Sequence, residues 1–311
     1  MKNIFKRIFK SKTTLIDALP PLKGKVIANY PLSKKTWFGV GGGAEVYVEP
    51  ADEDDLIRLL QFMPSVPLTI LGGGSNVLIR DGGIPGITVH LGKGFRNIKF
   101  NDESVICEGG VSLMELARAA AKQGVSGFEF LSGIPGTIGG AVRMNAGAHG
   151  KCLQDVLTSL TVITGDGEIR EIDPNETEIF GYRKCYLPSD WIFVRVVLKG
   201  QKGHPADIAA TMATYKQQRQ NNQPVGVKTA GSTFKNPQGL QAWSLIDKAG
   251  FRGYRKGGAM VSDKHTNFLI NLGDATAKDI EELGEEIRMK VWNDFGIELE
   301  WEVKKMGIEK E

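Results

Sequence analysis

The stretch Ser132–Gly150 reads SGIPGTIGGAVRMNAGAHG, and six of its nineteen residues are Gly. Glycine tolerates positive φ and lets a backbone approach a ligand without a Cβ in the way. Successive turns of this kind point several amide N–H groups into one concavity, which suits an anion such as a diphosphate. A tight crossover buried between two layers has the same composition. The stretch alone therefore predicts either an anion-binding loop or a packed turn.

Two further glycine clusters, Gly39–Gly43 and Gly72–Gly74, lie upstream, and the second follows the apolar segment Pro67–Leu71. None of the three clusters has the GxGxxG spacing, and no GxxxxGK[ST] motif occurs, which disfavours a standard dinucleotide fold and a P-loop enzyme. Three glycine loops in one domain suit a long ligand with two phosphates. Loops that are merely tight remain the alternative.

The composition is that of an ordinary globular protein, with 311 residues, 41% hydrophobic and 24% charged. A net charge of +3, spread along the chain, gives no nucleic-acid footprint. The three cysteines form no CxxC and have no His partners at zinc spacing, so we expect neither a disulfide framework nor a metal site. No run approaches the ~20 apolar residues of a spanning helix. These features predict a cytoplasmic protein without a transmembrane segment.

The N-terminal residues MKNIFKRIFKSK place apolar and basic side chains on different sides of a short predicted helix. They lack the uninterrupted apolar run and the cleavage site of a secretory signal. We expect a terminal flap on the protein itself, with contact to a membrane surface as the alternative.

The hydrophobic pattern predicts an α+β protein with an N-terminal extension (1–30), a glycine-rich first domain (31–200) and a smaller second domain (201–311). Helices are expected at 52–63, 112–124, 205–220, 242–249 and 276–295. Ser112 and Glu115 have the spacing of a capping box. Strands are expected at 67–71, 77–80, 87–91, 104–108, 160–164, 168–172, 191–198, 268–271 and 297–303, with a hairpin turn at Asp166–Gly167.

Seven fragments occur in a fixed order: TWFGVGGGAE, LGGGSNVLIRDGG, GIPGTIGGAVRMNAGAHG, FGYR, GSTFKNP, HTNFLIN and IELEWEV. Together they resemble the UDP-N-acetylenolpyruvoylglucosamine reductase (MurB) family from about Leu32 to Gly307. Only 48 residues separate Arg183 from Ser232, as in the branch without the long substrate-loop insertion. The resemblance implies an FAD-binding domain of the vanillyl-alcohol-oxidase (PCMH) type in two subdomains, followed by a C-terminal α+β substrate domain.

The same resemblance implies a flavin-dependent oxidoreductase. NADPH would reduce noncovalently bound FAD, and UDP-N-acetylglucosamine enolpyruvate would then be reduced to UDP-N-acetylmuramate, a step of peptidoglycan precursor synthesis. The protein must stabilise negative charge on the substrate carboxylate and deliver one proton. We expect it to act as a monomer.

Three residues match the family's catalytic positions. The resemblance implies that Arg183 holds the substrate carboxylate, that Ser232 donates the proton, and that Glu302 orients the developing enol. The planar guanidinium suits two carboxylate oxygens. Periodicity alone cannot choose among Glu298, Glu300 and Glu302. The residues that we expect to contact the substrate are Tyr182, Lys235, Asn236, His265 and Asn267.

The expected FAD contacts lie in the glycine loops. They are Gly41, Gly42, Gly72, Gly73, Gly74, Ser75, Asn76, Gly133, Pro135, Gly136, Thr137, Gly139, Gly140, Asn145, Ala146 and Gly147. Cys185 departs from the hydroxyl residue that is common in the family two positions after the arginine. His149 and Cys152 keep a flavin-linked oxidase open as an alternative. A noncatalytic module that binds a UDP-sugar or flavin is another, although it would not need the three catalytic residues together.

Overall fold

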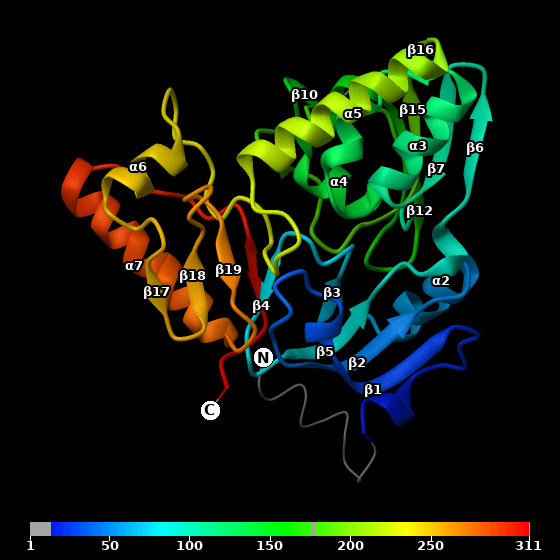
Figure 1. The fold of residues 1–311 in the computed structure, drawn as a ribbon. Helices are drawn as coiled ribbons and strands as arrows, with labels where there is room; N and C mark the ends of the chain where they lie inside the picture. The colour runs from blue at the N-terminus through cyan, green and yellow to red at the C-terminus, as the bar shows by residue number, and fades with distance from the viewer. Residues whose placement is uncertain (1–13, 176–177, 311) are drawn as a thin grey trace.

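The computed structural model describes residues 14–175 and 178–310, so the helix predicted near the N-terminus lies outside the described residues. The chain forms the predicted α+β fold, with three sheets of three or more strands and the helices packed around them (Figure 1). The helices are α2 (Glu53–Phe62), α3 (Leu113–Gln123), α4 (Ile138–Met144), α5 (Pro205–Asn222), α6 (Ala242–Lys248) and α7 (Ala277–Phe295). Short 3-10 helices are η1 (Ile16–Ala18), η2 (Leu32–Lys34), η3 (Lys93–Phe95), η4 (Glu129–Gly133) and η5 (Leu153–Val156).

The first sheet has the order β1 (Lys25–Pro31), β2 (Gly43–Glu49), β5 (Ile84–Val89) and β3 (Leu68–Ile70). Only the β1–β2 pair is antiparallel; β5 runs parallel to both of its neighbours. Helix α2 begins as predicted at Asp52, whose carboxylate accepts the Asp55 N–H at 2.8 Å. Its buried leucines pack against β2 and β5 in one core.

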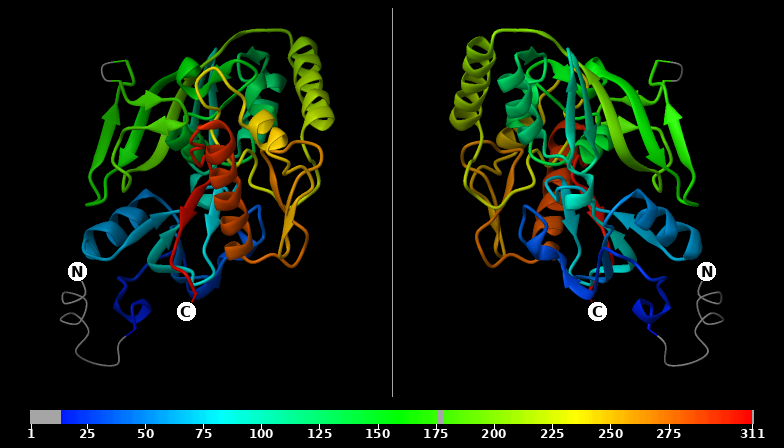
Figure 2. Two further views of the ribbon diagram at one scale, coloured as in Figure 1. Left: turned by 90° about the vertical axis from the view of Figure 1, so that its left-hand side faces the viewer. Right: turned by 90° about the vertical axis from the view of Figure 1, so that its right-hand side faces the viewer.

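The second sheet is antiparallel, in the order β12 (Ile169–Ile172), β11 (Leu157–Ile163), β15 (Ile192–Lys199), β7 (Ser104–Glu108) and β6 (Ile98–Asn101). The hairpin predicted at Asp166–Gly167 joins β11 to β12, and Gly167 has φ +84°. Helices α3 and α4 share the core with β7, β11 and β15. Helix α5 lies across α3 and η4 (Figure 2).

The third sheet is β17 (Arg255–Lys256), β18 (Ala259–Val261) and β19 (Leu269–Asn271), and α7 packs on it. Thr276 and Asp279 form a capping box at the start of α7, and Gly296 ends the helix at φ +67°. The last strand, β20 (Lys304–Met306), pairs in parallel with β4 (Val77–Ile79). Because β4 follows the second glycine cluster, the C-terminal residues return to the glycine-rich first half of the chain.

Three small antiparallel pairs complete the strands. They are β8 (Val125–Ser126) with β16 (Gln201–Lys202), β9 (Gly147–Ala148) with β10 (Lys151–Cys152), and β13 (Phe180–Gly181) with β14 (Lys184–Cys185). The last two pairs lie close to the site described below.

Two local predictions were wrong. The capping box at Ser112 does not form, since Ser112 makes no side-chain capping bond and the Leu113 N–H donates instead to the Gly136 C=O at 3.1 Å. Residues 297–303 are not a regular strand, although Leu299 and Val303 are buried as expected. They bend around the loop 231–237 and form one isolated bridge there.

The elements that were not predicted include strand β1 and helix α4. Strand β1 lies within the residues assigned to the N-terminal extension, and its mostly exposed side chains give no alternating pattern. Helix α4 lies inside the glycine-rich stretch, where Thr137 caps it and Asn145 ends it at φ +39°. The division of the chain at residues 30 and 200 stays a prediction.

Candidate active site

Arg183 lies at the tip of the β13–β14 hairpin with φ +55°. A residue with a side chain adopts this left-handed conformation at a cost of about 1–3 kcal/mol, so surrounding contacts must hold it. The Arg183 Nε donates to Oε1 of Glu302 at 3.0 Å, and Nη2 donates to the Gly147 C=O at 3.0 Å. Nη1 has no acceptor among the described residues. One edge of the guanidinium is therefore fixed and the rest is free to bind a ligand.

Glu302 precedes β20, and its backbone is held on both sides. Its N–H donates to the Thr233 C=O at 2.8 Å, and its C=O accepts the Asn76 side-chain N–H at 3.1 Å. Burial raises the pKa of Glu302 above its usual range, although the attraction of Arg183 opposes this. Of the three glutamates that periodicity could not separate, only Glu302 contacts Arg183; Glu298 pairs with Arg288 and Glu300 with Lys235.

Ser232 lies in the loop 231–237 and forms an isolated bridge with Phe268. Its neighbour Thr233 accepts the Glu302 N–H and donates its own N–H to the Asn267 C=O at 2.7 Å. The structure thus brings the Arg183–Glu302 pair and the Ser232 loop together from three distant parts of the chain.

Asn267 holds this loop from beneath. Its side-chain oxygen accepts the Phe234 N–H at 3.0 Å, and its side-chain N–H donates to the Phe234 C=O at 2.8 Å. Only 3% of the residue is exposed. The geometry therefore favours a positioning role for Asn267 over the substrate contact expected from the sequence.

The other expected substrate contacts surround the loop. Tyr182 is exposed at the hairpin tip, with its ring 5.3 Å from the Arg183 guanidinium carbon. Lys235 is nearly buried and pairs with Glu300. The Asn236 side chain accepts the Ala242 N–H at 3.0 Å and so helps to begin α6. His265 packs edge-on against Phe268, its Nδ1 has no partner among the described residues, and burial lowers its pKa.

Two of the glycine loops contact each other. The Ser75 hydroxyl donates to the Pro135 C=O at 2.9 Å, and a Cβ on Gly73 would lie 2.8 Å from the Gly136 Cα. Within the described ranges, no protein acceptor receives the backbone N–H of residues 72–76 or of Gly136 and Thr137. These seven backbone N–H groups have no acceptor in the described protein and lie on two loops in contact. Such a group of donors suits the diphosphate of FAD.

Other glycines of the predicted set have structural contacts. Gly42 donates its N–H to the Arg80 C=O, and Gly139 donates to the Gly109 C=O. A Cβ on Gly41 would lie 2.6 Å from the Ile79 carbonyl oxygen. The Asn145 side chain accepts the Gln154 N–H and donates to the Gly181 C=O, which ties α4 to the hairpin of Arg183. Ala146 donates its N–H to the Ala141 C=O. Contact of these residues with FAD stays a prediction.

The residues considered for covalent flavin attachment have other surroundings. The His149 ring stacks on Tyr215 with centroids 3.7 Å apart. Burial raises the pKa of the Cys152 thiol, which disfavours the nucleophilic thiolate. Cys185 is buried in the core that α3 and α4 share with the second sheet, and burial also raises the pKa of its thiol.

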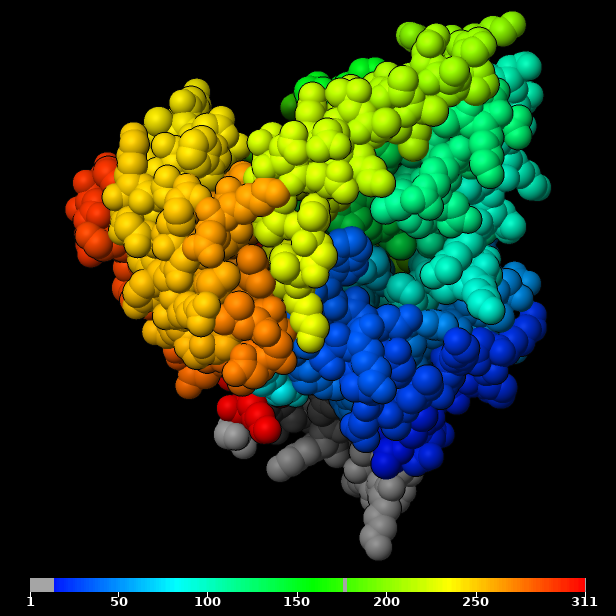
Figure 3. Space-filling model, viewed as in Figure 1, coloured from blue at the N-terminus to red at the C-terminus, as the bar shows by residue number. Residues whose placement is uncertain are grey.

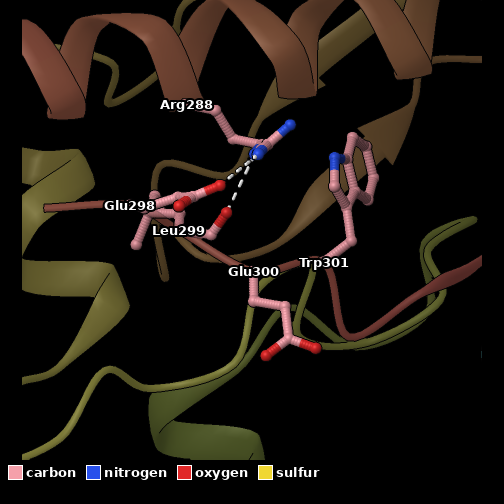
Figure 4. Close-up of a pocket in the computed structure, with 5 residues that line it drawn as sticks. All are labelled: Arg288, Glu298, Leu299, Glu300 and Trp301. Atoms are coloured by element: carbon pink, nitrogen blue, oxygen red, sulfur yellow. Dashed lines mark hydrogen bonds and ion pairs between the residues drawn. The ribbon is translucent and has the colours of Figure 1, made fainter.

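A surface pocket lies beside the extended residues Glu298–Trp301, away from the glycine loops (Figure 4). Its cation, Arg288, already donates to the Leu299 C=O and to the carboxylates of Glu285 and Glu298. The guanidinium is therefore satisfied, and the pocket offers no free cation to a substrate.

Comparison with known proteins connects both halves of the chain to one activity. A family model described as "FAD binding domain" matches residues 44–173. A second, described as "UDP-N-acetylenolpyruvoylglucosamine reductase, C-terminal domain", matches residues 223–306. Glu302 lies within the second matched range, and Arg183 lies in the interval between the two ranges.

Whole-chain relatives carry the same name. UDP-N-acetylenolpyruvoylglucosamine reductase from Paramagnetospirillum magneticum is 48% identical, over 95% of this chain and 96% of its own. The enzyme of that name from Parvibaculum lavamentivorans is also 48% identical, over 97% of each chain. The crystal structure of the Thermus caldophilus reductase has a TM-score of 0.80 and 36% identity, and covers 92% of this chain and 100% of its own. The chain belongs to the UDP-N-acetylenolpyruvoylglucosamine reductase family of FAD-dependent oxidoreductases.

Proposed function

We propose that this protein reduces the enolpyruvyl ether of UDP-N-acetylglucosamine to UDP-N-acetylmuramate with electrons from NADPH, and that Arg183, Glu302 and Ser232 perform the protein's part. The observation that carries this proposal is the Arg183–Glu302 ion pair, which is bonded through Thr233 to the Ser232 loop. Bound FAD supplies the hydride donor for the vinyl carbon. Besides the hydride, the reaction needs stabilisation of negative charge and one proton. Arg183 and Glu302 are the candidates for the first, and Ser232 is the candidate for the second.

Arg183 binds the substrate carboxylate in this proposal. Glu302 and Gly147 occupy one edge of its guanidinium, so Nη1 and the second Nη2 proton remain for the ligand. Negative charge grows on the carboxylate and on the adjacent carbon when a hydride adds to the conjugated vinyl group. A fixed cation in a half-buried site stabilises that charge better than a mobile one, because it needs no reorganisation. The strained backbone of Arg183 fits such a preorganised position.

Ser232 delivers the proton to the carbon that becomes carbanion-like. Its loop is fixed by the two-sided bond of Asn267 to Phe234 and by the Glu302 N–H. Glu302 keeps Arg183 in place, and its raised pKa means that it is less costly to protonate there than in water. In this proposal Glu302 orients Arg183 and the developing enol, and the single proton comes from Ser232.

FAD would be held by the amides of residues 72–76 and of Gly136 and Thr137, without a covalent bond. These loops support this because their backbone N–H groups have no protein acceptor among the described residues. Burial also raises the pKa of Cys152, which is one alternative point of covalent attachment. NADPH and the UDP-sugar would enter the same site in turn.

We also propose a monomer in the cytoplasm. All three catalytic candidates come from one chain, which supports this proposal. The three cysteines are free. Among the helices of residues 14–175 and 178–310, none combines the length and apolar character that a membrane crossing requires.

Anaerobic titration of the purified protein tests the proposed reaction. We expect the visible absorbance of the bound flavin to bleach with NADPH and to recover with the enolpyruvyl substrate. Recovery only with oxygen would support an oxidase of the same fold. Absence of bleaching and recovery would leave a binding module, and either result would refute the proposal.

A further inference from the structure

Helix α5 presents two side chains to the glycine-rich stretch at its C-terminal end. The helix is otherwise polar and exposed, with Ile208 as its one buried residue. Tyr215 and Arg219 are four residues apart and so share a face. The Tyr215 ring stacks on His149, and the Arg219 Nη1 donates to the Gly133 C=O. Figure 3 shows this end of α5, in yellow-green, against the C-terminal part, and Lys264 donates to the Gln220 C=O there.

The charge of Arg219 has no counterion among the described residues. Its Nε is buried without a hydrogen-bond partner, and burial alone lowers its pKa. A buried guanidinium is ordinarily paired with an acid or surrounded by acceptors, because desolvating an unpaired cation is costly. Arg219 thus has unused hydrogen-bond capacity at a desolvated position.

Arg143 provides the comparison. It also lies in the glycine-rich stretch and burial also lowers its pKa. Its guanidinium, however, donates to the carbonyl oxygens of Leu187, Pro188 and Trp191 at 2.7–2.9 Å. Arg143 therefore has a structural role that is complete within the protein, whereas Arg219 does not.

The carbonyl that Arg219 contacts begins the loop that carries the unspent amides of Gly136 and Thr137. A guanidinium beside a group of backbone N–H donors is well suited to a phosphate, which accepts several charge-assisted hydrogen bonds at once. Neither Gly133 nor Pro135 supplies a charge. Arg219 on α5 would add the positive charge that the loop residues do not supply.

We propose that Arg219 is the cationic part of a diphosphate-binding site formed with the glycine loop 133–137. This inference rests on the proposed function, because FAD, NADPH and the UDP-sugar each carry a diphosphate joined to a nucleoside. Arg219 donates its free N–H groups to a phosphate oxygen, while its Nη1 stays on Gly133. In the complex, the negative charge of the phosphate then compensates the cation, which has no counterion among the described residues.

Flavin titrations of the full-length apoprotein test the proposal. Arg219→Gln removes the charge and keeps a donor for Gly133, and Arg219→Lys keeps the charge if the Gln variant fails to fold. Lys216→Gln is the matched control, because Lys216 is an exposed cation on the same helix. Quenching of flavin fluorescence gives the Kd of FAD and of riboflavin, which has no phosphate. Steady-state assays of FAD-saturated enzyme give the KM of NADPH and of the UDP-sugar.

If the diphosphate is that of FAD, Arg219→Gln raises the Kd of FAD by about 10- to 100-fold and leaves that of riboflavin unchanged. Arg219→Lys shows a smaller loss and Lys216→Gln none. If it belongs to a substrate, FAD binding stays normal and the KM of NADPH or of the UDP-sugar rises by a similar factor. Equal weakening of FAD and riboflavin, or no change in any of these constants, would overturn the proposal. Failure of the wild type to be reoxidised by the enolpyruvyl substrate would instead count against the proposed function.

Discussion

The Nε of Arg183 lies 3.0 Å from Oε1 of Glu302, although 119 positions separate the two residues in the chain. Arg183 comes from a hairpin that lies between strands β12 and β15 of the second sheet in the chain, and Glu302 from the segment that leads into the last strand. The pairing of β20 with β4 brings the second residue back to the first. The ion pair therefore depends on the packing of the C-terminal part against the FAD-binding part.

Arg183→Lys tests whether the shape of the cation matters. An ammonium group cannot bind Glu302, Gly147 and both oxygens of a carboxylate in one plane. We expect normal reduction of the flavin by NADPH and reoxidation by the enolpyruvyl substrate that is slower by about 10²-fold or more. Stopped-flow absorbance measures the two half-reactions separately. An unchanged second half-reaction would remove Arg183 from the mechanism.

Glu302→Gln should increase stability at neutral and alkaline pH. Because burial raises the pKa of Glu302, the folded state binds more protons than the unfolded state between the ordinary carboxyl pKa of about 4.3 and the raised value. Stability therefore falls as pH rises through that window, and the neutral amide removes the cost. The melting temperature of the variant should exceed that of the wild type at pH 8.

The difference between the two melting temperatures should narrow as pH falls towards 5. The same variant should show slower reoxidation by the enolpyruvyl substrate, because Arg183 loses its partner. A variant that is less stable than the wild type at pH 8 would contradict the sign of the pKa shift.

Asn267→Ala should loosen the Ser232 loop. The change leaves the N–H and the C=O of Phe234 without partners in a buried place, which costs about 1–3 kcal/mol per group. We expect a lower melting temperature and a slower second half-reaction, with the KM of the UDP-sugar changed little. Asn97→Ala, which removes an exposed side-chain bond to Glu108 of the second sheet, is the control. A rise in the KM of the UDP-sugar alone would restore the role of Asn267 as a substrate contact.

Gly73→Ala should impair FAD binding. Its Cβ would come 2.8 Å from the Gly136 Cα and force the two glycine loops apart. At Gly43 the nearest atom would be 3.4 Å away and φ is not positive, so Gly43→Ala is the control. Acid precipitation should release the yellow colour of the wild type into the supernatant and much less from Gly73→Ala. Colour kept in the wild-type pellet would indicate covalent attachment.

The sequence predicted the elements with strong periodic patterns. Helices α2 and α7 begin and end close to their predicted caps, because Asp52, Thr276 and Gly296 act through their immediate neighbours. The hairpin at Gly167 was equally local. The family resemblance supplied Arg183, Ser232 and Glu302, which spacing alone could not select.

What the sequence could not predict depends on long-range contacts. The capping box at Ser112 does not form, and the backbone there instead bridges to Thr137 in the distant glycine-rich stretch. Asn267 was expected to contact the substrate, yet both ends of its amide bind Phe234 inside the protein. No sequence motif marks Arg219. It stands out only in the structure, where its buried Nε has no hydrogen-bond acceptor among the described residues.

Ser232→Ala tests proton donation most directly. A positioned acid typically contributes about 10²–10⁴ in rate, or roughly 3–5 kcal/mol of barrier. FAD content, flavin reduction by NADPH and substrate affinity should stay near wild type, and Ser232→Cys, which keeps a donor, should retain more activity. The deciding measurement is rapid-mixing absorbance of prereduced enzyme against the enolpyruvyl substrate. We predict that the Ala variant is reoxidised at least about 10²-fold more slowly than the wild type; reoxidation of that variant at a near wild-type rate would contradict the role of Ser232 as proton donor.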